Sequence, residues 1–539
     1  MDFDTAAPRF GRLAAFLIVF LTWVAIYLPA LGAREFRGEE TRRVLPAVEM
    51  LKTGRWLVPQ VGGELYYRKP PVINWLVAAS FVLTGEQTEL TARLPSVVFV
   101  LAFAAAVIWG GGRWLRLEAR LIAALLFLTS VAMIEKGRQI EIEAVYISQT
   151  SIAILLWLTL WAGEASPWTL WLAPSLFLTM GMLTKGPPIL VFYYAPVIGV
   201  LAYSGRLRTL LSAPHVVSLA LSLGVPAGWA YLAMAEAARQ HVAAPVAGEL
   251  LTRLTSASEG PGQWARNVGK SFINLLPWGA FLPLLWRRDF LSHLPADRLP
   301  LLKGARLGLV ISFLAITLVP GNSGRYGLPV LGLMSLLLGW VLGEVGELPD
   351  RGRLWRAVAL AVFAAAGLVA VAGFAGVRRD LWSAVALCGT LCLAVLVIRE
   401  RRTFHLPVHL AVLSAAATIL LMIQYSLLVP SRMAKTENRR PVAARINALV
   451  PSSDTIYVLK PGHQGFLFYI RQPFEYVVDP SRIDERVRFL LLREDAYRQL
   501  KDDPAIALRR PGTLYSFAGH SSDFRLLELH PPNSTHATP

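Results

Sequence analysis

Charged residues are scarce in this chain of 539 residues. Asp, Glu, Lys and Arg together make up 17% of it, whereas hydrophobic residues make up 55%. A soluble globular chain carries about 25% charged residues. The low charge content therefore argues against a soluble protein, and the apolar residues gather in long uninterrupted runs rather than in an amphipathic pattern.

Cysteine is also nearly absent. The chain has two cysteines, Cys388 and Cys392, four residues apart within one apolar run. This spacing places both side chains on one face of a helix, where free cysteine packs as a small apolar residue. The sequence therefore offers no framework of disulfides and no cysteine-based metal centre.

The apolar runs predict an α-helical polytopic membrane protein. A helix needs about 20 apolar residues to cross the hydrocarbon core, and many runs approach that length. The first run, Leu13–Leu31, is too long for the apolar region of a cleaved signal peptide, so we expect a retained helix. About thirteen spans are expected, near residues 12–32, 92–112, 119–135, 144–163, 168–183, 188–204, 213–236, 270–286, 301–320, 327–346, 354–376, 380–398 and 406–429.

Basic residues mark alternate ends of these helices. Clusters such as Arg113–Arg120, Arg206–Arg208 and Arg399–Arg402 fall on the side that the positive-inside rule assigns to the cytoplasm. Their placement accounts for much of the formal charge of +17 and argues against a nucleic-acid partner. The same rule predicts a cytoplasmic N-terminus and an outer C-terminus. It also requires the short apolar stretch Pro71–Leu83 to lie at the outer face without crossing.

Two domains are expected. Residues 1–430 would form the transmembrane module, with a first outer loop at residues 33–91, and residues 431–539 would form a small extramembranous α/β domain. Short elements are expected in this domain: strands at Thr455–Leu459, Phe466–Ile470 and Phe489–Leu492, and a helix at Pro441–Leu449.

The first outer loop carries the densest set of candidate site residues. Glu39, Glu40 and Arg42 open a short amphipathic segment, and Tyr67 and Lys69 precede a Pro-Pro pair. The helix dipole favours carboxylates at a helix start, so the two glutamates fit an ordinary helix start as well as a functional site.

Further polar residues lie at the outer ends of predicted helices. Charged groups at membrane depth are costly and tend to mark function. The ordinary alternatives are a solvated helix cap for the carboxylates and solvated loop charges for the cations. The candidates are Arg138, Glu141 and Glu143 in the second outer loop, Lys185 in the turn Thr184–Pro188, and Arg325 with Tyr326 in the turn Gly321–Pro329.

Carboxylates and isolated cations on one membrane face suit the transfer of a sugar from a lipid phosphate. A carboxylate can take the proton from an acceptor hydroxyl. Lys69, Lys185 and Arg325 would stabilise the departing phosphate. No set of metal ligands stands out in the sequence.

Several short motifs follow one another in order along residues 10–335. They are Gly38–Arg42, Gly54–Pro59, Tyr67–Pro71, Asn74–Trp75, Ala92–Ser96, Thr184–Pro188, Leu276–Trp278 and Arg325–Pro329. Together they resemble the membrane glycosyltransferases of the GT-C type, specifically the bacterial branch near protein O-mannosyltransferases and lipid A aminoarabinose transferases.

The resemblance implies roles for individual residues. The family's catalytic base in the first outer loop corresponds to Glu39, and the lysine that contacts the donor phosphate corresponds to Lys69. A second acidic position corresponds to Glu143, with Glu141 as its rival. The family usually carries Asp at the acidic positions, and one added methylene displaces a carboxylate by about an ångström, which matters at a catalytic centre. Arg43 stands where an aromatic residue is common.

The resemblance also implies substrates and a compartment. The donor would be a polyprenyl-phosphate-linked sugar, and the acceptor a lipid A, a protein or a glycan. Transfer would proceed with inversion at the periplasmic face of the bacterial inner membrane. Metal dependence differs among such relatives, so the resemblance leaves a divalent metal open as a cofactor.

Three other functions remain open from the sequence. A transporter or lipid flippase should show an internal repeat, and the sequence has none that we can find. A non-catalytic protein that binds lipid-linked sugars fits the replacement of Asp by Glu. A polymerase or ligase of cell-surface polysaccharide would use a related lipid carrier.

Overall fold

The chain folds into two compact units. One comprises Met1–Leu31 and Arg93–Val429, and the other comprises Gly32–Ala92 and Pro430–Pro539. The structure, a computed structural model, describes residues 11–67, 69–239, 260–287, 294–319, 321, 323–344, 418, 439–501, 503–507, 509, 511–518 and 523–530.

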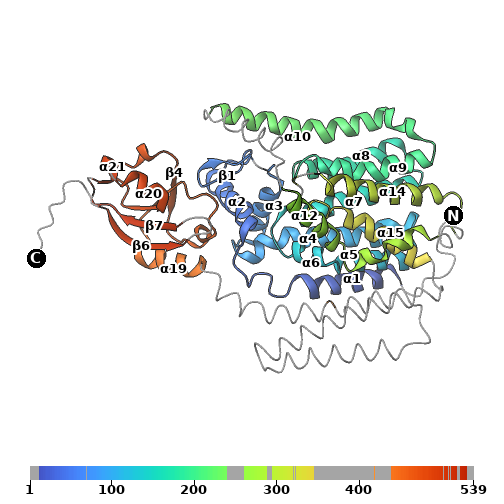
Figure 1. Cartoon of the computed structure of the whole chain (residues 1–539), viewed down its shortest axis with the longest axis horizontal. Helices are drawn as coiled ribbons and strands as arrows, with labels where there is room; N and C mark the ends of the chain where they lie inside the picture. The colour runs from blue at the N-terminus through green and yellow to red at the C-terminus, as the bar shows by residue number, and fades with distance from the viewer. Residues whose placement is uncertain are drawn as a thin grey trace, which may run out of the picture. The chain divides into compact units, whose positions relative to one another are not determined.

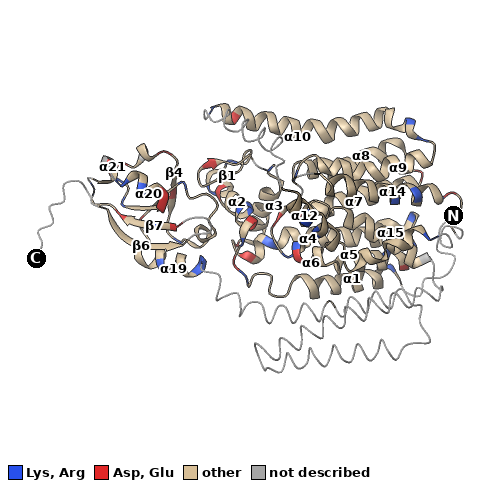
Figure 2. Cartoon of the chain, viewed as in Figure 1, with Lys and Arg blue, Asp and Glu red and all other residues tan. Residues whose placement is uncertain are grey.

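The first unit is a helical membrane bundle whose helices are mainly uncharged along their length (Figure 2). Among the described residues, four helices are long and apolar enough to cross a membrane, and the number is six if each of two bent helix pairs counts as one span. The elements of this unit are α1 (Arg12–Tyr27), α4 (Glu89–Gly110), η2 (Gly111–Arg113), α5 (Leu117–Leu128), α6 (Val131–Gly137), α7 (Ile142–Ala162), α8 (Pro167–Met182), α9 (Pro188–Tyr203), η3 (Leu207–Leu211), α10 (Ala213–Arg239), α12 (Pro261–Ile273), η4 (Trp278–Trp286), α14 (Leu299–Thr317) and α15 (Val330–Glu344), with the first residues of α4 in the second unit.

Small residues allow the helices of this unit to pack closely. On α14, a Cβ at Gly304 would lie 2.2 Å from the backbone nitrogen of Val200 on α9, and a Cβ at Gly308 would lie 2.2 Å from Pro196 Cα. Within lipid, close backbone approach of this kind drives helix association through van der Waals contact. The long helix α10 packs against α8 (Figure 1).

The sequence predicted most of these helices with small differences at their ends. The expected spans at 119–135 and 270–286 each consist of two pieces, bent by 62° and 81° respectively. At the first break, the hydroxyls of Thr129 and Ser130 donate to carbonyls one turn earlier, which loosens a helix. At the second break, Pro277 lacks the backbone N–H that would continue the helical hydrogen bonds. The expected spans 354–376, 380–398 and 406–429, with Cys388 and Cys392, lie outside the described residues.

The first outer loop has its own secondary structure within the second unit. Gly62 and Gly63 both have positive φ, 63° and 81°, which suits a two-residue hairpin turn. The apolar stretch that begins at Pro71 forms the helix Val72–Thr84, and Gly85 in the left-handed conformation ends it. The elements of the loop are η1 (Gly38–Glu40), α2 (Thr41–Thr53), β1 (Gln60–Val61), β2 (Glu64–Leu65) and α3 (Val72–Thr84).

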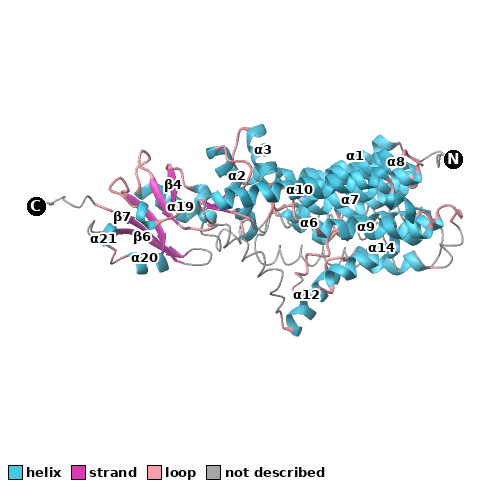
Figure 3. Ribbon diagram, turned by 90° about the horizontal axis from the view of Figure 1, so that it is seen from above, coloured by secondary structure: helices cyan, strands magenta, loops and turns pink. Residues whose placement is uncertain are grey.

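The C-terminal residues form a mixed sheet, whose strands are magenta in Figure 3. Its five strands lie in the order β4-β3-β5-β7-β6. β3 runs parallel to both β4 and β5, whereas β7 pairs antiparallel with β5 and β6. The elements are α19 (Arg439–Leu449), β3 (Ile456–Leu459), η5 (Gly465–Tyr469), β4 (Phe474–Val477), η6 (Pro480–Arg482), β5 (Phe489–Arg493), α20 (Glu494–Leu500), α21 (Pro504–Ala507), β6 (Gly512–Ala518) and β7 (Asp523–Glu528).

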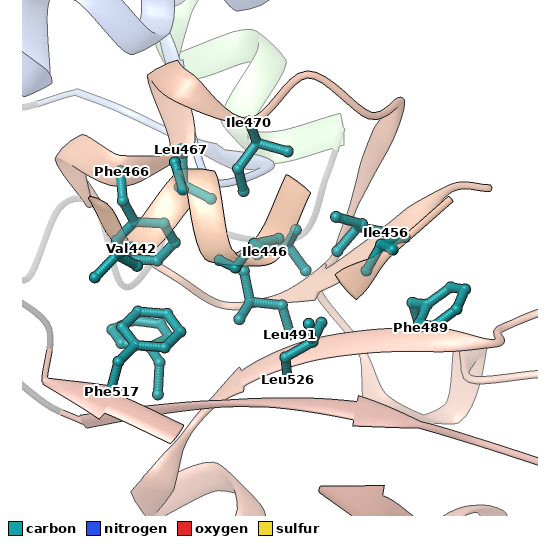
Figure 4. Close-up of a cluster of buried hydrophobic side chains, with 14 of the residues drawn as sticks. Val442, Ile446, Ile456, Phe466, Leu467, Ile470, Phe489, Leu491, Phe517 and Leu526 are labelled. Atoms are coloured by element: carbon teal, nitrogen blue, oxygen red, sulfur yellow. The ribbon is translucent and has the colours of Figure 1, made fainter. Parts of the chain in front are cut away.

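Alternation along β5 gives this sheet a core on each face. Phe489 and Leu491 enter a cluster with residues of α19, while Leu490 and Leu492 enter a second cluster on the opposite face. Figure 4 shows the first cluster, in which the side chains of Ile446 and Leu491 lie close together. Leu45, from α2 of the first outer loop, belongs to this cluster as well. Residues 32–92 therefore pack with the C-terminal residues in one unit.

One expected strand is wrong. Phe466–Ile470 contains the 3₁₀ helix η5 instead. Its apolar residues suggested a buried strand, but Phe466, Leu467 and Ile470 all enter one core cluster from the same side. The alternation of a strand would have turned neighbouring side chains to opposite faces. The α/β character predicted for this region is nevertheless confirmed, and residues 531–539 lie outside the described part.

Candidate functional site

The start of α7 brings two carboxylates into a buried charged cluster in the first unit. Glu141 is the N-cap residue of α7 and Glu143 lies in its first turn, where free backbone N–H groups favour negative charge. The side chains are 12% and 6% exposed, respectively. Carboxylates this deeply buried need positive partners, since an unpaired buried charge is costly.

Lys185 provides one such partner from the turn between α8 and α9. Its Nζ lies 3.4 Å from Glu143 Oε1 and faces the rings of Tyr146 and Tyr326 at 5.3 Å and 5.1 Å. Gly186 has φ of 101°, and the following prolines start α9, so the motif Thr184–Pro188 builds a tight turn that presents the lysine. Burial lowers the pKa of Lys185, and the nearby Glu143 opposes this effect.

Arg325 approaches the same carboxylates from the turn before α15. Its Nε lies 3.3 Å from Glu143 Oε1, and its Nη1 lies 3.8 Å from Glu141 Oε2. The turn is fastened to α12 at Gly324, whose carbonyl accepts hydrogen bonds from Ser271 and from Asn274 at 2.8 Å. A Cβ at Gly324 would lie 2.6 Å from Lys270 Cβ, so this close approach requires glycine.

The cluster contains two residues that sequence reasoning missed. Lys136 at the end of α6 lies 3.1 Å from Glu141, and Tyr146 faces Lys185. Tyr146 follows Glu143 by three residues on α7, a spacing that puts two side chains on one face of a helix and could have identified it. Burial raises the pKa of Glu141, and Lys136 opposes this shift. Two buried carboxylates are thus surrounded by three cations.

A second group of candidates lies in the second unit, on α2 and the loop that follows. Glu39 has both carboxylate oxygens paired, with Arg42 Nη1 at 2.7 Å and with Arg43 Nη2 at 3.1 Å. Arg43 is buried and also donates to the hydroxyl of Tyr66 at 3.1 Å. The side chain of Asn74 donates to the backbone carbonyl of Arg43. The arginine that replaces the expected aromatic residue is therefore a direct partner of Glu39.

The remaining candidates have diverse surroundings. Glu40 is buried and accepts a hydrogen bond from the backbone N–H of Arg37, an arrangement typical of a capping box. Tyr67 and Lys69 are half-buried just before α3. Arg138 donates to the carbonyl oxygens of Ile26 and Pro29 near the end of α1.

The structure thus places the sequence candidates in two groups. Glu39, Glu40, Arg42, Tyr67 and Lys69 belong to the second unit, whereas Arg138, Glu141, Glu143, Lys185, Arg325 and Tyr326 belong to the first. Across the described ranges, no group of three or more His, Cys, Asp and Glu side chains has the arrangement of a metal site.

Comparison with known proteins relates the chain to enzymes of lipid-linked sugars. Residues 68–231 match a family described as dolichyl-phosphate-mannose-protein mannosyltransferase. An undecaprenyl phosphate-alpha-4-amino-4-deoxy-L-arabinose arabinosyl transferase of Yersinia enterocolitica is 26% identical over 71% of this chain and 75% of its own length. A relative of the same name from Serratia proteamaculans is 29% identical over 42% of this chain and 40% of its own length. Another, from Pseudomonas savastanoi, is 25% identical over 40% of this chain and 40% of its own length. In several such matches the chain spans from 40% to 61% of the relative.

Solved structures show the same fold over nearly the whole chain. The crystal structure of ArnT from Cupriavidus metallidurans bound to undecaprenyl phosphate has a TM-score of 0.69 and is 18% identical, with 98% of this chain and 100% of that chain covered. The crystal structure of the same protein in the apo state has a TM-score of 0.67 and is 16% identical, with 95% of this chain and 97% of that chain covered. By fold, this chain is a multi-pass membrane protein, and in sequence and structure it is similar to the undecaprenyl phosphate-aminoarabinose arabinosyl transferases.

Proposed function

We propose that this chain is an integral membrane glycosyltransferase that moves a sugar from a polyprenyl-phosphate donor to an acceptor at the periplasmic face. The observation that carries the proposal is the convergence of Lys185 and Arg325 on the buried Glu143. Preorganised cations in a site that excludes water stabilise a departing phosphate more strongly than cations in water. The names of the similar relatives support undecaprenyl phosphate as the lipid and an amino-arabinose as the sugar.

The proposed chemistry assigns a role to each group. An acceptor hydroxyl attacks the anomeric carbon while the bond between that carbon and the phosphate oxygen breaks, which inverts the configuration. Glu39 takes the hydroxyl proton as general base, and Glu143 is the second catalytic carboxylate. Lys69, Lys185 and Arg325 stabilise the lipid phosphate that leaves with the bonding electrons.

Acceptor, compartment and domain organisation belong to the same proposal. The acceptor is a lipid A, a protein or a glycan. The N-terminus lies in the cytoplasm and the C-terminus in the periplasm, by the positive-inside rule. Residues 1–430 form the membrane module and residues 431–539 a periplasmic domain.

A transfer assay tests the function. The full chain in lipid nanodiscs is incubated with radiolabelled undecaprenyl-phosphate aminoarabinose and with lipid A, a protein mixture or a glycan as acceptor. We expect transfer to one acceptor class, and a loss of about 10²-fold or more in the variants Glu39→Gln, Lys69→Ala and Glu143→Gln. The matched control is Glu64→Gln, which neutralises an exposed carboxylate of the same loop. An arm with EDTA tests metal dependence.

The assay also distinguishes the competing function. Glu39 is engaged by two arginines, and this favours a non-catalytic protein that binds or transports lipid-linked sugars. Such a protein would bind the labelled donor without transfer to any acceptor. Normal transfer by both Glu39→Gln and Lys69→Ala would refute the assignment of these two residues.

A further inference from the structure

The two ends of the first outer loop meet at the start of α19. Near the beginning of the loop, the carboxylate of Glu35 accepts hydrogen bonds from the backbone N–H groups of Arg439 and Arg440, each at 3.1 Å. At the end of the loop, Glu89 forms an ion pair with the guanidinium of Arg440. One residue of the C-terminal region therefore contacts both ends of a loop that is more than 350 residues away in the sequence.

Both carboxylates that make these contacts are buried. Glu35 is 7% exposed and Glu89 is 6% exposed, so each carboxylate depends on its protein partners for charge compensation. Glu35 also occupies the N-terminus of α19, where the unpaired N–H groups of the first turn attract an anion. The hydroxyl of Tyr469 donates to Glu89 at 2.6 Å and accepts from the backbone N–H of Phe36 at 3.3 Å. Burial raises the pKa of Tyr469, so this hydroxyl stays protonated even well above neutral pH.

Between the two ends of the first outer loop, further contacts join α2 to the C-terminal residues. Leu45 is buried in the first core cluster of the sheet, and Thr41 Oγ1 donates to the carbonyl of His463 at 3.1 Å. At the far end of α2, Lys52 donates to the carbonyl of Phe474. Glu39 lies just before α2, and its backbone position is therefore set by contacts with residues of the C-terminal region.

We propose that Arg440 is a positioning residue, which holds Glu35 and Glu89 together, closes the first outer loop and thereby fixes the backbone that carries Glu39. The C-terminal domain then acts on sugar transfer through the loop without itself contacting the substrate. The closure of the loop by Arg440 is independent of the proposed function, and only its effect on transfer rests on that function.

Hydrogen exchange and transfer activity, measured on the full chain in nanodiscs, test this inference. In Arg440→Glu, which sets a third carboxylate beside Glu35 and Glu89, we expect amide exchange in residues 33–53 to accelerate at least tenfold and transfer to fall at least tenfold. Exchange in β5 and β7 should stay unchanged. The charge-swapped pair Glu89→Arg with Arg440→Glu should restore both quantities to within about threefold. Arg445→Glu, at an exposed position of the same helix, is the matched control and should change neither.

The outcomes separate the possible failures. Unchanged exchange in residues 33–53 would overturn the closure of the loop by Arg440. Faster exchange with normal transfer, or a charge-swapped pair without recovery, would overturn the positioning role. If Arg440→Glu also loosens β5 and β7, Arg440→Gln, which adds no negative charge, gives the deciding comparison by the same criteria. A wild-type chain without transfer would refute the proposed function but leave the exchange measurement interpretable.

Discussion

The guanidinium of Arg43 lies 3.1 Å from one carboxylate oxygen of Glu39, while Arg42 takes the other oxygen. The side chain of Arg43 is 4% exposed and that of Arg42 is 24% exposed. Ion pairs lose strength when water competes for the charges, so the two contacts differ in energy although they share one carboxylate. Arg43 is therefore the dominant electrostatic partner of the proposed base.

This difference can be measured with double-mutant cycles. We expect a coupling free energy of about 1–2 kcal/mol between Glu39→Gln and Arg43→Met, and of about 0.3–0.5 kcal/mol between Glu39→Gln and Arg42→Met. The free energy of local opening, from hydrogen exchange of the α2 amides, is the measurement. Equal coupling energies for the two arginines would contradict the ranking by burial.

We predict that turnover requires a positive charge at the position of Lys185. Replacement by Gln removes the positive charge that faces Tyr146, Tyr326 and Glu143, and we expect kcat/KM to fall by about 10²-fold. Lys185→Arg should retain more activity because it keeps the charge. Lys303→Gln, on α14, is the control and should transfer normally. A loss of less than threefold in Lys185→Gln would remove this residue from the site.

The close packing of α9 and α14 predicts intolerance to a single added methyl group. In Gly304→Ala the new Cβ would lie 2.2 Å from the backbone of Val200, so the helices must separate. We expect a destabilisation of about 1–3 kcal/mol, seen as a lower thermal unfolding temperature in detergent. Gly228→Ala on α10 is the control, because a Cβ there meets nothing within 4 Å. Equal unfolding temperatures for the two variants would show that the helices accommodate the methyl group without cost.

Glu494 should make the C-terminal sheet sensitive to acid. Hydrogen bonds from Arg525 lower the pKa of Glu494, and Arg498 adds a further contact at 3.2 Å. A lowered pKa in the folded state adds stability above the ordinary value of about 4.5, and this contribution disappears as the pH falls through the lowered value.

Hydrogen exchange of β7, corrected for the intrinsic pH dependence, gives the measurement. Glu494→Gln should exchange faster than wild type at pH 7, and the difference should shrink as the pH falls below about 4.5. Glu475→Gln, on β4, serves as the comparison. A difference that stays constant down to low pH would exclude the ionised carboxylate as its source.

Membrane orientation can be tested with single cysteines. In a background with Cys388→Ala and Cys392→Ala, Ser453→Cys and Leu207→Cys place exposed thiols in the C-terminal region and in the predicted cytoplasmic turn after α9. An impermeant maleimide should label the first in intact spheroplasts and the second only after permeabilisation. The reverse pattern would invert the proposed topology.

Local sequence patterns predicted the helices well, because the length and hydropathy of an apolar run are properties of neighbouring residues. The turn at Thr184–Pro188 could be read in the same way, since glycine and proline restrict the backbone where they stand. The strand expected at Phe466–Ile470 failed because its apolar residues fit a helix turn pressed against the core as well as a strand.

The pairing of charged residues that are distant in the sequence is visible only in the folded chain. The sequence identified Glu143, Lys185 and Arg325 as isolated polar residues at helix ends, each with an ordinary alternative as a solvated charge. Their convergence depends on how α7, α9 and α15 pack, and short-range patterns do not encode the partner of a buried charge. The same holds for Arg440 and Glu89, 351 residues apart, whose contact exists because the first outer loop packs with the C-terminal sheet.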